Sequence, residues 1–243
     1  MKIIYSTNPK REATDALARI FKEYKDIPVL FLSSGGSALS LLDPSILPEN
    51  VNLTVSVLDE HYVADPNERN FEKLKKTEFF RVATKQPPSS QIRTPPVYDY
   101  FTLLRGIDPY GGTVEEAGKR FDLVLKNWMS ENPDGKIVCT VGMGADGHTA
   151  GIVPLSDAAL FEKLFNSPET LAVGYKTNYG PFPERVTSTF SLLKVVSDVI
   201  LYASGEEKRK IIEAFLGKKQ PLNEFPALFL KTLPQLTFFT DSV

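Results

Sequence analysis

Short apolar runs alternate with helical segments along the chain, and this alternation constrains the fold more than any other feature. The runs are residues 29–32, 137–141, 198–203 and 236–239, and residues 51–57 alternate apolar with polar residues as a strand does. Before the first of them, residues 9–25 have the apolar spacing of one helical face. Strands that alternate with helices are typical of an α/β protein with a mostly parallel sheet and helices on both of its faces. We expect residues 1–243 to form one such domain.

The net charge and the length of the apolar runs argue against nucleic-acid and membrane partners. The chain has 243 residues, with 28 Lys and Arg against 30 Asp and Glu, so its formal net charge is −2. This balance argues against a broad basic surface for nucleic acid. The longest apolar run, residues 27–32, is far shorter than the roughly 20 residues that span a bilayer. We expect a cytoplasmic protein without nucleic-acid or membrane partners, acting as a monomer or small homo-oligomer.

The cysteine count and the N-terminal segment decide what is expected of disulfides, thiolate metal sites and a secretory signal. Cys139 has no second cysteine to pair with, which excludes an internal disulfide and a thiolate metal cage. The N-terminal segment MKIIYSTNPKRE turns polar almost at once, so no secretory signal is expected.

The carboxyl ends of four predicted strands carry the most polar and glycine-rich segments of the chain. These segments are SSGGS, DEH, GMGADGH and SGEEK. In open α/β sheets, ligands bind beyond the carboxyl ends of the strands. We therefore expect one crevice to gather all four segments, together with both histidines.

The first segment, Gly35-Gly36-Ser37, lies between a predicted strand and a predicted helix at 38–42. Glycines let a backbone approach an anion closely, and N–H groups at a helix start favour negative charge. An ordinary tight turn with Ser37 as the helix N-cap explains the segment equally well.

The third segment contains Gly142, Gly144 and Gly147, which match the dinucleotide-binding pattern G-x-G-x-x-G. That function is disfavoured, because Pro154 follows too soon for a long helix and Asp146 would occupy the pyrophosphate position. A catalytic loop is a better interpretation. An imidazole has an unperturbed pKa near 6.5, so His148 is a candidate base, with Asp146 or Asp59 fixing its tautomer. The alternative is a structural histidine.

The remaining charged candidates are Asp59, Glu60, Arg185 and Lys208. At least one of the two carboxylates should face the crevice. Lys208 lies in the first turn of a predicted helix, where a cation opposes the helix dipole unless an anion is present. A metal site formed by Asp59, Glu60, His61 and His148 lacks any recognised ligand spacing, so we expect no metal.

Taken together, the segments resemble a known family. SSGGS, VLDEHYVADPNERN, VGMGADGHTAGIVP, PERVTST and SGEEK occur in the order found in 6-phosphogluconolactonases and the related glucosamine-6-phosphate deaminases. The resemblance covers roughly residues 10–240. It implies a modified Rossmann-like α/β domain without a metal or redox cofactor.

Within this family, the chain is more similar to the lactonases. Deaminases carry an acidic residue seven positions after the Asp of D-G-H, and this chain has Val153 there. HTAGIVP is similar to the lactonase pattern H-T-A-S-L-F-P. Two departures occur, because His61 stands where lactonases have Arg, and Arg69-Asn70 stands where they have Ser-Asn. We hypothesise that Arg69 supplies the guanidinium missing at position 61.

The resemblance implies hydrolysis of 6-phosphoglucono-δ-lactone, a phosphorylated sugar lactone, to 6-phosphogluconate. His148 would activate water, while Asp146 and Asp59 would orient it or bind hydroxyls. The implied substrate-binding residues are Gly35, Gly36, Ser37, Glu60, Arg69, Asn70, Gly142, Gly144, Arg185 and Lys208. Two alternatives stay open: a glucosamine-6-phosphate deaminase or sugar-phosphate isomerase, and a non-catalytic sugar-phosphate-binding protein. Residues 84–112, rich in proline, are expected to form a long loop or flap.

Overall fold

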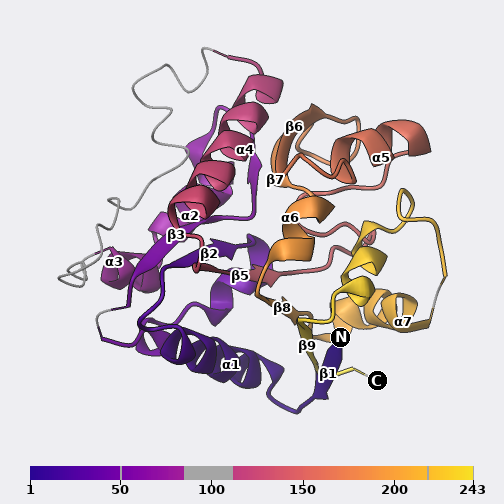
Figure 1. Cartoon of the computed structure of the whole chain (residues 1–243). Helices are drawn as coiled ribbons and strands as arrows, with labels where there is room; N and C mark the ends of the chain where they lie inside the picture. Colours follow the sequence, from indigo (N-terminus) through magenta and orange to yellow (C-terminus); the bar gives the residue numbers. More distant parts are fainter. Residues whose placement is uncertain (50, 85–111, 218, 243) are drawn as a thin grey trace.

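The computed structural model describes residues 1–49, 51–84, 112–217 and 219–242. Its centre is a six-stranded sheet with the order β1-β9-β8-β5-β2-β3 (Figure 1). All neighbouring strands in this sheet run parallel, which confirms the predicted α/β fold. The strands are β1 (Lys2–Tyr5), β2 (Val29–Ser33), β3 (Leu53–Val57), β5 (Lys136–Val141), β8 (Asp198–Tyr202) and β9 (Leu236–Thr240).

The central strands carry apolar side chains on both faces. Side chains alternate between the two faces along a strand. In β2, Leu30 and Leu32 accordingly belong to one core cluster, and Val29 and Phe31 belong to the other. Such two-sided burial is why these strands are continuous apolar runs in the sequence.

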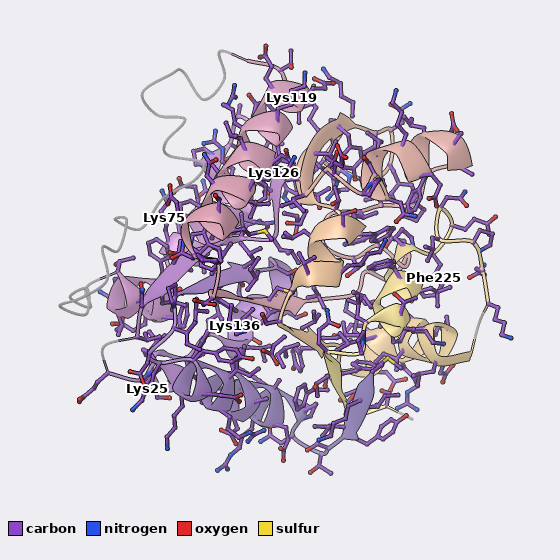
Figure 2. All side chains as sticks on the ribbon, in the orientation of Figure 1. Lys25, Lys75, Lys119, Lys126, Lys136 and Phe225 are labelled. Carbon is purple, nitrogen blue, oxygen red and sulfur yellow. The ribbon has the colours of Figure 1, made fainter. Side chains whose placement is uncertain are left out.

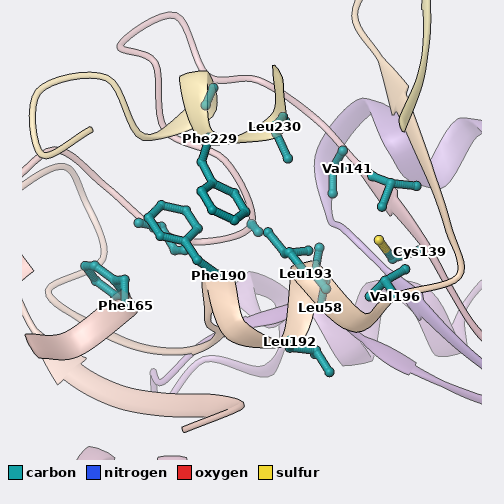
Figure 3. Packing of buried hydrophobic residues seen from close by; sticks show 14 of the residues in the cluster. Leu58, Cys139, Val141, Phe165, Phe190, Leu192, Leu193, Val196, Phe229 and Leu230 are labelled. Carbon is teal, nitrogen blue, oxygen red and sulfur yellow. The ribbon is translucent and has the colours of Figure 1, made fainter. Parts of the chain in front are cut away.

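Helices cover both faces of this sheet, as predicted (Figure 1). One face packs against α1, α2 and α3, and the other against α4, α6 and α7. On the latter face, Phe190 of α6 stacks on Phe229 with ring centroids 4.0 Å apart (Figure 3). The helices are α1 (Pro9–Glu23), α2 (Asn70–Lys75), α3 (Glu78–Ala83), α4 (Val114–Glu131), α5 (Ala158–Phe165), α6 (Phe190–Val195) and α7 (Arg209–Gly217).

A second, three-stranded antiparallel sheet has the order β4-β7-β6. It comprises β4 (Asp59–His61), β6 (Ala172–Lys176) and β7 (Glu184–Ser188). The sequence analysis did not predict this sheet. Its strand β4 has three residues, all of them polar, and gives no apolar signal. Because β4 follows β3 after the single residue Leu58, this sheet begins at the carboxyl end of β3.

The helical prediction at 38–42 is corrected in type, because the chain forms the 3₁₀-helix η1 (Gly36–Leu41) there. Further 3₁₀ turns are η2 (Pro44–Ile46), η3 (Pro66–Glu68), η5 (Glu206–Lys208) and η6 (Pro226–Thr232). The predicted flap at 84–112 lies, except for its two end residues, outside the described residues. Across the described segments, no helix combines the length and the apolar character needed to cross a membrane.

Candidate active site

A cavity of about 310 Å³ lies where the carboxyl ends of β3, β2, β5 and β8 meet the small sheet. These four strands are consecutive neighbours in the large sheet, so their polar ends converge. The segments predicted to gather in one crevice all contribute to this cavity. Ten predicted site residues line it: Gly35, Gly36, Ser37, Asp59, Asn70, Gly142, Gly144, His148, Arg185 and Lys208.

His148 lines this cavity and forms a hydrogen-bonded pair with Asp146, a predicted catalytic residue that is not itself among the lining residues. Nδ1 of His148 lies 2.6 Å from Oδ1 of Asp146, which also accepts the His148 backbone N–H at 3.1 Å. Burial opposes ionisation of Asp146, but the hydrogen bond and charge of His148 outweigh it and hold the pKa of Asp146 below its usual range. An ionised carboxylate accepts a hydrogen bond, so Nδ1 carries the proton. In the neutral ring, Nε2 is then free to accept one.

Glycine at position 144 leaves room for this pair. A Cβ atom there would overlap Nδ1 of His148 and Oδ1 of Asp146. Gly147 has a φ of 83°, in the left-handed region, and its Cβ position is filled by the ring of Phe225, which is buried (labelled in Figure 2). The loop is therefore shaped closely around the imidazole and the carboxylate.

The small sheet holds the end of the His148 loop. Tyr175 of β6 donates its hydroxyl hydrogen to the Gly151 carbonyl at 2.6 Å, and Thr187 of β7 donates to the Ala150 carbonyl. Thr149 donates back to the Gly142 carbonyl at 2.8 Å. These bonds connect two sheets and fix the position of His148 between them.

The alternation of side chains along β4 decides which of its residues face the cavity. Asp59 pairs with Thr187 and His61 with Arg185 in the register with β7. Asp59 and His61 share one face and line the cavity, whereas Glu60 points to the opposite face. Burial raises the pKa of Asp59, against the lowering effects of Arg185, His148 and the hydrogen bond from Asn70.

Glu60, a predicted substrate-binding residue, is not among the residues lining this cavity. Its buried carboxylate accepts backbone N–H groups from His61 at 2.9 Å, Asn70 at 2.5 Å and Phe71 at 2.9 Å. It therefore ties β4 to the start of α2. This tie brings in Asn70, whose side-chain amide donates to both the carbonyl and the carboxylate of Asp59.

Arg69 is also absent from the lining residues. Its guanidinium donates from Nε to the Val63 carbonyl at 2.9 Å and from a terminal nitrogen to the Ala64 carbonyl at 2.7 Å. The hypothesis that Arg69 supplies a guanidinium to the site in place of position 61 has no support in this geometry. The side chain instead holds the loop between β4 and α2.

Two cations reach the cavity from different directions. Arg185 of β7 is 6% exposed, and its Nε has no hydrogen-bond partner among the described residues. Lys208, from η5 just before α7, donates from Nζ to the Met143 carbonyl at 2.7 Å. This hydrogen bond places Lys208 beside the His148 loop.

His61 lines the cavity together with His148, so both histidines lie there as expected. Several further lining residues, among them Met143, Pro181 and Phe182, were not singled out from the sequence. Phe182 lies in the connection between β6 and β7, and no pattern in the sequence relates that connection to the site. In the described part of the chain, no three His, Cys, Asp or Glu side chains are grouped so that they could hold a metal ion.

Fold and site together define an α/β protein with a carboxylate-bonded histidine, an arginine and a lysine at a cavity beyond the carboxyl ends of parallel strands. A family model described as glucosamine-6-phosphate isomerases/6-phosphogluconolactonase matches residues 12–237. The chain belongs to this family.

Similar proteins include the "probable 6-phosphogluconolactonase" of Drosophila melanogaster, 26% identical over 228 residues that cover 86% of this chain and 77% of that protein. A 6-phosphogluconolactonase of Borreliella burgdorferi is 31% identical over 107 residues, which cover 42% of this chain and 40% of that protein. Among solved structures, a 6-phosphogluconolactonase from Shewanella baltica has a TM-score of 0.69 at 18% identity and covers 99% of this chain and 96% of its own. The enzyme from Trypanosoma brucei has a TM-score of 0.69 at 19% identity, covering 98% of this chain and 95% of its own.

Proposed function

We propose that this protein hydrolyses 6-phosphoglucono-δ-lactone to 6-phosphogluconate. The observation that carries the proposal is the 2.6 Å pair of His148 Nδ1 and Asp146 Oδ1 at a cavity that also contains Arg185 and Lys208. Family membership and the printed names of the relatives support the same reaction. No cofactor or metal is part of the proposal.

In this mechanism, His148 acts as general base. Its Nε2 takes a proton from a water molecule, whose oxygen attacks the lactone carbonyl carbon. The tetrahedral intermediate then collapses, the bond between the carbonyl carbon and the ring oxygen breaks, and the ring oxygen takes the proton from His148. One water is added, giving a carboxylic acid and a hydroxyl group. General-base catalysis of this kind is typically worth about 10²–10⁴-fold.

Asp146 keeps the His148 tautomer that this step requires, and it stabilises the imidazolium that forms during the reaction. The negative charge on the carbonyl oxygen needs hydrogen-bond donors. The backbone N–H groups around Gly142 are candidates for that role. The N–H of Gly144 is not, because it donates to the His148 carbonyl at 2.9 Å.

The phosphate of the substrate would bind between Arg185, Lys208 and the backbone of Gly35, Gly36 and Ser37. The planar guanidinium of Arg185, which lines the cavity, suits a phosphate oxygen, and Lys208 adds a point charge. The first N–H groups of a helix have no partner inside it, so the start of η1 offers further donors.

The deaminase alternative requires a second acidic residue to pair with the histidine, as the family resemblance implies. Val153, at that position, is 1% exposed and belongs to the hydrophobic core. The carboxylate on His148 Nδ1 is Asp146, so the arrangement favours the lactonase. We also retain a cytoplasmic location as part of this proposal.

Parallel measurements with three compounds, two as substrates and one as a ligand, test the function. Purified protein is mixed with fresh 6-phosphoglucono-δ-lactone, and acid release is followed with the uncatalysed hydrolysis subtracted. Parallel samples contain glucosamine 6-phosphate, or 6-phosphogluconate in a binding measurement. We expect rapid acid release from the lactone and no ammonia from the amino sugar. Ammonia release would favour the deaminase, and binding without turnover would favour the sugar-phosphate-binding protein.

A further inference from the structure

His61 lines the cavity beside Arg185, and the proposed mechanism gives it no role. It is the last residue of β4, directly across from Arg185 in the register with β7. It lines the same cavity as His148. The chain has only these two histidines.

A backbone carbonyl determines the tautomer of His61. Nδ1 lies 2.8 Å from the Glu68 carbonyl oxygen. A carbonyl oxygen only accepts hydrogen bonds, so Nδ1 must carry the hydrogen. In a neutral imidazole, Nε2 then holds a lone pair. Among the described residues, none donates a hydrogen bond to Nε2.

The surroundings of His61 keep the ring neutral. Burial is the largest effect and lowers the pKa of His61 to about 4, against the opposing effect of the Glu68 carbonyl. The positive charges of Arg185 and Lys73, and that of His148 when protonated, act in the same direction as burial. At neutral pH the ring therefore offers an acceptor and not a cation.

The ring is also held in place before any ligand binds. It stacks on Phe182 with centroids 3.8 Å apart and an angle of 16° between the planes. Phe182 lines the cavity as well, and Arg185 Cζ lies 5.9 Å from the centroid of its ring. A side chain fixed by a hydrogen bond on one edge and a stacked ring on one face loses little entropy when a ligand binds.

We propose that His61 is a specificity-determining residue that accepts a hydrogen bond from a sugar hydroxyl through Nε2. The inference rests on the proposed function, since it concerns the same cavity and a polyhydroxylated sugar phosphate as ligand. The cavity offers donors for a phosphate in Arg185 and Lys208. It also needs acceptors for hydroxyl groups, and Asp59 and His61 share the β4 face that supplies them.

Two substitutions separate the acceptor from the aromatic ring. His61→Phe keeps the stack on Phe182 but removes both nitrogens, whereas His61→Gln can place an amide oxygen near the Nε2 position. A neutral hydrogen bond contributes about 0.5–1.5 kcal/mol, so we expect His61→Phe to raise KM about 2–10-fold with kcat unchanged. His61→Gln should stay closer to the wild-type KM.

Lys73→Gln is the matched control. Lys73 Nζ lies 3.3 Å from the same Glu68 carbonyl oxygen that His61 contacts. The substitution therefore removes a nearby charge and the second donor to this carbonyl, but it leaves the imidazole and its own hydrogen bond to Glu68 in place. KM should remain that of the wild type. Equal KM values for wild type and His61→Phe would overturn the proposal, as would equal increases in His61→Phe and His61→Gln.

Nitrogen NMR of histidine-labelled wild-type protein gives a second readout that does not depend on turnover. With two histidines, the spectrum contains two imidazoles, and the His61→Gln variant assigns them. We expect His61 to carry its hydrogen on Nδ1, and its Nε2 signal to shift when 6-phosphogluconate is added but not when inorganic sulfate is added. A hydrogen on Nε2, or no shift with saturating 6-phosphogluconate, would contradict the proposal.

The two proposals fail separately in these experiments. If wild-type protein does not hydrolyse the lactone but the Nε2 signal of His61 still responds to 6-phosphogluconate, only the proposed reaction is wrong. If the lactone is hydrolysed but His61 does not respond and His61→Phe keeps its KM, only the role of His61 is wrong.

Discussion

At the scale of single residues, the site depends on small side chains as much as on charged ones. His148 can point Nε2 at the cavity because Asp146 holds Nδ1. That pair exists because residue 144 has no Cβ atom. The orientation of the His148 imidazole therefore depends on glycine at position 144.

We expect Gly144→Ala to disturb the imidazole without unfolding the protein. The added methyl group must displace His148 or Asp146, and overpacking typically costs about 1–3 kcal/mol. Loss of the oriented tautomer should lower kcat about 10-fold or more, within the range of general-base effects. Steady-state kinetics and thermal melting measure both quantities. Gly217→Ala is the control, because a Cβ there meets nothing within 4 Å. Unchanged kcat in Gly144→Ala would mean that the pair does not matter.

Sequence reasoning found most of these residues but not their orientation. Gly-rich loops and charged groups at strand ends were visible, so ten of the predicted residues line the cavity. The direction of Glu60 depends on where β4 begins, and a three-residue polar strand gives no register. Arg69 carries a guanidinium, but its use by two nearby carbonyls is a property of the folded loop.

At the scale of elements, β4 and the loop that follows it connect the small sheet to α2. The Glu60 side chain accepts the backbone N–H of His61 in β4 and those of Asn70 and Phe71 at the start of α2. Burial raises the pKa of Glu60 to about 7, although the hydrogen bonds from Phe71, Asn70 and His61 oppose the shift. A carboxyl whose pKa is higher in the folded state stabilises the fold at low pH and loses that contribution as pH rises.

Glu60→Gln tests this element. The amide nitrogen cannot accept a hydrogen bond, so at least one buried N–H loses its partner, and we expect a loss of about 1–3 kcal/mol at pH 5. The wild-type contribution is fully present below the unfolded pKa near 4.5 and falls as pH rises through about 7. The difference in unfolding free energy between the two proteins should therefore decrease by about 2–3 kcal/mol from pH 5 to pH 8.

Urea unfolding of both proteins at the two pH values measures this difference. Other titrating groups are common to both proteins and cancel. A difference that is equal at pH 5 and pH 8, or larger at pH 8, would contradict the role given to Glu60.

At the scale of the whole molecule, five of the six strands of the large sheet were predicted from the sequence, whereas β1 (Lys2–Tyr5) and the small sheet were not. Strands β2, β5 and β8 carry runs of apolar residues, and β3 alternates apolar with polar residues, so these patterns predict them. In the small sheet, β7 begins with Glu184-Arg185, and Tyr175 of β6 uses its hydroxyl to hold a distant loop. Strands β6 and β7 bond to the His148 loop, and β7 also pairs with β4. These partners lie far away in the sequence, so no local pattern predicts the small sheet.

The two sheets contribute different residues to the site. The large sheet supplies Gly35 to Ser37 and the His148 loop, while the small sheet supplies Arg185 and His61. The single-domain organisation and the oligomeric state stay predictions from the sequence.

The central claim is that an oriented imidazole at this cavity activates water for lactone hydrolysis. The most direct measurement compares kcat for 6-phosphoglucono-δ-lactone in wild-type protein and in His148→Ala, with circular dichroism to verify that both are folded. His148 is partly exposed at the cavity and leaves no core void when truncated, so the fold should be unchanged. We predict that kcat falls about 10²–10⁴-fold. A folded His148→Ala protein that retains the wild-type kcat would contradict the account.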